Sequence, residues 1–117
     1  MGVFEKKQTP VPFKQITDGF QVGSRLFIRS DGLEYILRLI QNPGQSIACC
    51  DLYFGSEHRK GRDGDKEKCR QKVRRSIRAA IIKIIEQAET KKIGSHLKDS
   101  IKTGASCVYV GTWEWEL

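Results

Sequence analysis

The side chains with the clearest chemical potential in this chain are the basic ones between residues 59 and 83. This stretch holds 11 of the chain's 21 Lys and Arg residues, and no Asp or Glu lies between Lys68 and Lys83. Lys and Arg side chains aligned along one side of a helix can neutralise successive phosphates. At about 100° per residue, one side of a helix through this stretch collects Lys68, Lys72, Arg75, Arg78 and Lys83. The pattern predicts a surface that binds a polyanion.

A loop that contains glycine precedes this predicted helix, from residue 55 to residue 64. It carries Arg59, Lys60 and Arg62 beside His58. A helix N-terminus presents free backbone N–H groups and the positive end of the helix dipole, which together suit one anion. The glycines are not followed by the Lys-Ser/Thr pair of a P-loop, so the loop gives no support for nucleotide hydrolysis.

Three functions are consistent with this charge. The first is a small nucleic-acid-binding protein that contacts phosphates largely independently of base sequence, with RNA, single-stranded DNA and duplex DNA not distinguished. The second is a protein-interaction module, such as a small inhibitor or adaptor, that docks its basic helix on an acidic or nucleic-acid-binding partner. Ile82 lies on the basic side of the helix and would be a contact in that case. The third is a binder of a small phosphorylated ligand at the loop.

Aromatic side chains near the C-terminus form a second candidate surface. Tyr109, Trp113 and Trp115 fall on one face of an alternating segment. On an open sheet, such a row could stack unpaired bases. The alternative is that the rings pack under the amphipathic helix as part of the core, which the pattern favours.

The cysteine and histidine residues do not predict a metal site or catalysis. Cys49, Cys50, Cys69 and Cys107 contain no Cys-x-x-Cys pair, and we expect buried, reduced thiols. His58 and His96 lie in no recognisable catalytic setting. The sequence therefore predicts a protein that is not an enzyme and that needs no cofactor.

The run from residue 33 to residue 41 is compatible with two structures. As a strand it alternates, and as a helix it forms one apolar stripe with Ser30 or Asp31 as its cap and with Glu34 and Arg38 as an ion pair. We expect the strand, because the run is short and lies between Asp-Gly and Asn-Pro-Gly turn signals.

Other elements follow from periodicity. Alternation predicts strands over residues 20–29 and 107–117, and the apolar run 45–54 suggests a central strand. A stripe at three- and four-residue steps predicts a helix from about residue 65 to residue 92, with Gly94 placed to end it.

These elements predict an α+β fold. We expect an antiparallel sheet of about four strands, formed by a β-meander and a C-terminal strand, with the long amphipathic helix packed on one face. Residues 1–18 contain two prolines and little periodicity, so we expect a partly flexible N-terminal arm before a single domain of residues 19–117.

The composition also predicts the partners, the cellular location and the oligomeric state of the protein. The formal net charge of the 117 residues is +7, which favours nucleic acid or acidic protein surfaces as partners. No apolar run resembles a signal peptide or a membrane helix, so we expect an intracellular protein, cytoplasmic or nuclear, without a membrane partner. The apolar middle strands exceed what one helix covers, which suggests a homodimer formed through the sheet.

Overall fold

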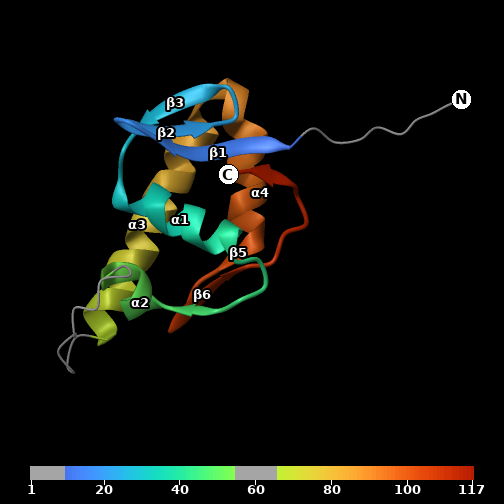
Figure 1. Ribbon diagram of the computed structural model, residues 1–117. Helices are drawn as coiled ribbons and strands as arrows, with labels where there is room; N and C mark the ends of the chain where they lie inside the picture. Colours follow the sequence, from blue (N-terminus) through green and yellow to red (C-terminus); the bar gives the residue numbers. More distant parts are fainter. Residues whose placement is uncertain (1–9, 55–65) are drawn as a thin grey trace, which may run out of the picture.

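The computed structural model describes residues 10–54 and 66–117 and confirms the α+β class (Figure 1). Its larger sheet is built from β1 (Val11–Ile16), β2 (Gly19–Val22), β3 (Arg25–Ile28) and β7 (Trp115–Glu116), in the order β3-β2-β1-β7. Strands β1, β2 and β3 form an antiparallel meander, but they lie within residues 11–28 and not in the segments 20–29, 33–41 and 45–54 from which a meander was predicted. The predicted purely antiparallel sheet is wrong, because β7 runs parallel to β1. All of the described helices lie between these two strands in the sequence, and a connection of that length allows parallel pairing.

The meander begins earlier than the sequence suggested. Residues 11–16, which were expected in a flexible arm, form β1, and Phe13 is fully buried against Phe20 of β2 with ring centroids 6.2 Å apart. The strand predicted over residues 20–29 is divided between β2 and β3. Gly23 turns the chain there with a φ of +60°, a left-handed conformation that favours glycine.

Residues 33–41 are helical, so the expected strand is wrong. Helix α1 (Asp31–Gln41) begins at Ser30, whose hydroxyl accepts a hydrogen bond from the Leu33 N–H at 3.3 Å. Its buried stripe packs against α3, and an apolar stripe of this kind forms only in a helix. Glu34 forms its ion pair with Arg29 at 3.0 Å, rather than with Arg38.

The predicted central strand over residues 45–54 is also wrong. Only β4 (Ile47–Ala48) is extended, and it pairs with β6 (Ser106–Tyr109) in a small sheet of order β4-β6-β5, where β5 is Ile101–Lys102. The chain then forms the short helix α2 (Cys49–Phe54). A helical turn buries both Cys49 and Leu52, three residues apart, and leaves Asp51 exposed.

The predicted long helix is confirmed over α3 (Lys66–Glu86). It ends at a 3₁₀ turn (Ala88–Thr90), where the buried Thr90 hydroxyl donates to the Ile84 carbonyl at 2.7 Å and so satisfies one terminal acceptor. Gly94 does not end a helix as predicted, because it lies inside α4 (Lys91–Ser100).

Helices lie on one face of the four-stranded sheet, and the core forms between the two layers (Figure 1). On the outward side of the edge strand β3, Leu26 and Ile28 are 68% and 84% exposed. The sheet-mediated homodimer stays a prediction. Among the helices of the described ranges, none combines the length and the apolarity needed to cross a membrane.

Candidate functional site

Helix α3 separates apolar from basic side chains along its whole length. Its buried residues lie at three- and four-residue steps and pack toward α1, α2 and α4: they are Cys69, Val73, Ile77, Ala80, Ile81 and Ile84. The opposite side carries six exposed Lys and Arg residues, which we call the basic face: Lys68, Lys72, Arg74, Arg75, Arg78 and Lys83. The predicted amphipathic helix is therefore present, and the structure adds Arg74 to the predicted basic residues.

The charges of the basic face are not paired within the described part of the chain. The one ion pair of α3 there joins Arg70 to Glu67 at 3.1 Å, outside the basic face. Other described ion pairs involve Lys14, Arg25 and Arg29. Like charges three or four residues apart on a helix repel by about 0.2–0.5 kcal/mol per pair, and the basic face contains several such pairs. No ion pair with a described residue compensates this repulsion, and an anionic ligand would relieve it.

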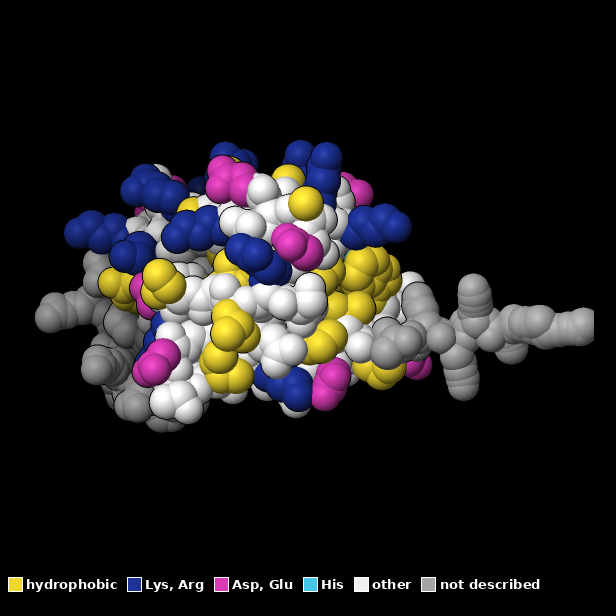
Figure 2. Space-filling model, turned by 90° about the horizontal axis from the view of Figure 1, so that it is seen from above, with side chains coloured by type: hydrophobic (Ala, Val, Ile, Leu, Met, Phe, Trp, Pro, Cys, Tyr) yellow, Lys and Arg dark blue, Asp and Glu magenta, His cyan; other side chains and the backbone are white. Residues whose placement is uncertain are grey.

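The basic residues point in different directions around α3. Lys72 and Arg75 are exposed near the middle of the basic side. Arg74 and Arg78 lie toward α4 and border a groove between the two helices, while Lys83 borders a hollow on the other flank beside β3. Figure 2 shows many Lys and Arg side chains along one edge of the molecule, with acidic side chains between some of them. The arrangement presents a broad positive surface, not a single anion pocket.

The loop that was predicted to bind an anion lies outside the described residues. Arg59, Lys60 and Arg62 lie in residues 55–65, outside the described residues. Ile82, the predicted partner contact, is 48% exposed and borders the groove beside α4.

The C-terminal aromatic residues form a closed cluster with a histidine, which we call the aromatic cluster: His96, Tyr109, Trp113 and Trp115. Tyr109 is 1% exposed, so it offers no face to a base. The His96 ring lies parallel to Trp113, with centroids 4.0 Å apart and planes inclined by 8°. Trp115 contacts Phe13 edge to face and is partly buried. This geometry supports the core interpretation of the aromatic row over the base-stacking one.

Hydrogen bonds connect this cluster internally. The Trp115 Nε1–H donates to the Tyr109 hydroxyl at 3.1 Å, and this hydroxyl lies 2.7 Å from His96 Nε2. Because the Tyr109 oxygen already accepts from Trp115, we assign the hydroxyl proton to the bond with His96, whose Nε2 is then the unprotonated acceptor. Burial lowers the pKa of His96 and raises that of Tyr109, which is consistent with a neutral pair.

His96 was not identified as a structural residue from the sequence. The signal that could have found it is helical spacing: Ile93, Leu97 and Ser100 are buried in α4, and His96 lies beside them, with Nδ1 3.4 Å from the Ser100 hydroxyl.

The cysteines are free thiols, as expected. Cys49, Cys69 and Cys107 are buried, and Cys49 Sγ lies 3.8 Å from Cys107 Sγ. Burial raises the pKa of the Cys107 thiol to about 12 and also raises that of Cys49, so neither thiol is poised as a nucleophile. Over residues 10–54 and 66–117, no group of three or more His, Cys, Asp or Glu side chains could hold a metal ion.

Comparison with known proteins adds no relative to this description. No family model, no curated protein and no solved structure matches the chain.

Proposed function

We propose that this chain is a small nucleic-acid-binding protein whose basic face contacts phosphates largely independently of base sequence. The observation that carries the proposal is the basic face itself: six exposed Lys and Arg side chains on one helix, without an ion pair to any described residue. A helix that served only to cover the core would be more stable with acidic residues between the basic ones. A phosphate backbone supplies the missing negative charge at regular intervals.

The aromatic cluster supports the same mode of binding. Because Tyr109 is buried and Trp113 lies against His96, this cluster does not offer an open row of rings for bases. Single-strand-binding surfaces commonly combine a basic groove with stacking rings. A basic face that receives no stacking rings from this cluster is suited to contact the backbone, which carries no sequence information directly. We therefore propose a binding protein, and not an enzyme, that acts on intracellular nucleic acid in the cytoplasm or nucleus.

The test measures the affinity of the full chain for fluorescent oligonucleotides, both single-stranded and duplex, by polarisation. The variant Lys72→Glu/Arg75→Glu reverses two charges in the middle of the basic face. We expect it to weaken binding by at least about tenfold, and to reduce the slope of log Kd against log salt by about 2, because each lost phosphate contact changes the slope by about one.

The matched control is Lys91→Glu/Lys92→Glu, which changes the net charge equally at exposed positions of α4. It should weaken binding by less than about threefold, since only long-range attraction is lost. Equal losses in the two variants would show that net charge, and not the basic face, attracts the oligonucleotide. Failure of the unaltered chain to bind any oligonucleotide at low salt would reject the proposal.

A further inference from the structure

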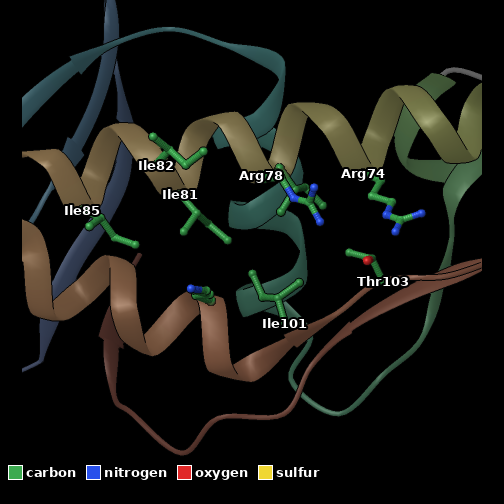
Figure 3. Close-up of a pocket in the computed structure, with 9 residues that line it drawn as sticks. Arg74, Arg78, Ile81, Ile82, Ile85, Ile101 and Thr103 are labelled. Carbon is green, nitrogen blue, oxygen red and sulfur yellow. The ribbon is translucent and has the colours of Figure 1, made fainter.

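A groove with an apolar floor and a basic rim opens between α3 and α4. Its volume is about 430 Å³, and its floor is formed by Ile77, Ile81 and Ile101. Figure 3 shows Arg74 and Arg78 extending from α3 over the space that leads to Ile101 and Thr103. Lys98 of α4 also lines the groove.

Gly94 explains why the groove exists. A Cβ atom at this position would lie 2.5 Å from Ile85 Cγ1 and 2.9 Å from the Ile85 backbone nitrogen, so α4 approaches α3 here as only a glycine permits. Beyond this point α4 diverges from α3, as Figure 3 shows. The two helices therefore form a wedge that is closed near Ile85 and wide near Arg74 and Thr103.

Among residues 10–54 and 66–117, nothing fully covers the apolar surface at the groove. Ile82 is 48% exposed at the rim, and Ile85 is only partly buried. An exposed isoleucine beside an apolar floor gains from burial under an apolar ligand group. Phosphate groups do not supply such a group, so phosphate contacts alone would leave the floor uncovered.

The positive charge at the rim of the groove indicates that the ligand is also acidic. Within the described ranges, Arg74, Arg78 and Lys98 take part in no ion pair, although all three are exposed at the groove. Carboxylates at the edges of a ligand would pair with these side chains, while its apolar side chains met the isoleucines. A second copy of the chain would instead place basic rims against each other, and like charges oppose association.

We propose that this groove binds an acidic amphipathic helix of a partner protein. From Arg74 to Ile85, α3 borders the groove over about 17 Å, or about three helical turns. A partner helix of that length presents apolar anchors at positions i, i+3 or i+4, and i+7 on one side, with Asp and Glu beside them. Arg74 and Arg78 are shared with the basic face, but the test of this proposal changes Ile82 and Lys98, and neither is changed in the test of nucleic-acid binding.

The test uses the full chain and a fluorescent synthetic peptide of about 16 residues that has leucines at these spacings and glutamates on their flanks. A second peptide of the same composition scatters the leucines around the helix, and a third replaces the glutamates with lysines. Polarisation should show binding of the first peptide at least about tenfold tighter than that of either of the others.

Variants of the chain locate the binding. Lys98→Glu should weaken the first peptide's affinity by at least about tenfold, and Ile82→Ala should weaken it several-fold. Oligonucleotide affinity should change by less than about twofold in either variant. Lys92→Glu makes the same charge change at an exposed position of the same helix, outside the residues that line the groove, and should cost less than about twofold. Thermal unfolding of each variant checks that it folds.

Several outcomes would overturn the proposal. The first is that the first peptide does not bind at concentrations up to about 1 mM. The second is that the peptide with scattered leucines binds equally well. The third is that Lys98→Glu and Lys92→Glu lose the same amount of affinity for the first peptide. If the unaltered chain dimerises in sedimentation and Lys98→Glu dissociates it, the groove belongs to a second copy. If Lys98→Glu and Ile82→Ala weaken only oligonucleotide binding, the groove is part of the nucleic-acid surface. Loss of nucleic-acid binding in Lys72→Glu/Arg75→Glu tests the proposed function separately.

Discussion

The basic face of α3 and the C-terminal aromatic cluster both suggested nucleic-acid contacts in the sequence, but the folded chain uses them in opposite ways. In the aromatic cluster, rings stack on one another and the polar atoms of His96, Tyr109 and Trp115 bond among themselves. On the basic face, six charged side chains extend into solvent without an ion pair to a described residue.

The difference follows from physical chemistry. Burying an aromatic ring stabilises the fold, and the polar group of a Tyr or Trp side chain can form its hydrogen bond inside the protein. A Lys or Arg side chain cannot be buried without a paired charge, so it stays at the surface and keeps its capacity to bind. A row of aromatic residues is therefore weaker evidence for a binding surface than an unpaired row of charges.

The largest expected effect comes from breaking the aromatic cluster. Tyr109→Ala should lower the free energy of unfolding by about 3–5 kcal/mol, because it leaves a cavity at a residue that is 1% exposed. Urea denaturation measures this loss. The variant Tyr109→Phe keeps the ring and leaves Trp115 Nε1 and His96 Nε2 without their partner, so it should cost about 1–3 kcal/mol.

These two variants also test the comparison between the regions. The folded molecules of each variant should bind oligonucleotides with the same affinity as the unaltered chain. A stable Tyr109→Ala protein that no longer bound oligonucleotides would show that the cluster is a binding surface and that its burial has been misjudged.

A smaller effect concerns pH. Burial lowers the pKa of His96 below its ordinary 6.5, and the protonated ring could no longer accept the hydrogen bond from Tyr109. Below pH 6.5 the unfolded chain therefore binds more protons at this residue than the folded chain, so the contribution of His96 to stability is complete above that pH. It is lost as the pH falls from 6.5 through the lower pKa of the folded state.

Urea denaturation at a series of pH values between about 7.5 and 5 measures this contribution. His96→Gln should show a flatter dependence over the same range than the unaltered chain. Identical pH profiles for the two proteins would contradict the assigned hydrogen bond between Tyr109 and His96.

The smallest effect comes from relieving repulsion on the basic face. Arg75 has Lys72 three residues before it and Arg78 three residues after it. Arg75→Gln should leave stability unchanged or raise it by about 0.2–0.5 kcal/mol at low salt, and the gain should disappear at high salt because salt screens the charges. A loss of more than about 1 kcal/mol would reveal a structural bond of Arg75 and would remove one charge from the proposed binding set.

The structure also shows which predictions could be made from local patterns. Helix α3 was predictable because its stripe is long and periodic, and β2 and β3 because apolar and polar residues alternate. Residues 33–41 fit two periods, and it is the packing of their apolar stripe against α3 in the folded chain that favours the helix. Residues 11–16 form a strand because β2 and β7 pair with them. The local sequence cannot indicate the parallel partner β7, because Trp115 lies about 100 residues after Val11.

The candidate site was predictable to a similar degree. Its charge and its helix were evident in the sequence, and so was Ile82 as an apolar residue among basic ones. The groove was not, since it depends on how closely Gly94 lets α4 approach Ile85 and on where α4 then diverges. Such an angle between two helices is set by packing and not by the composition of either helix.

The central claim, that α3 binds phosphates and the aromatic cluster does not, can be tested in one NMR titration of the isotope-labelled chain with a short oligonucleotide. We predict that amide signals of Lys72, Arg75 and Arg78 shift with increasing ligand, and that the indole N–H signals of Trp113 and Trp115 stay in place. Large shifts of the indole signals together with unmoved signals along α3 would contradict the account.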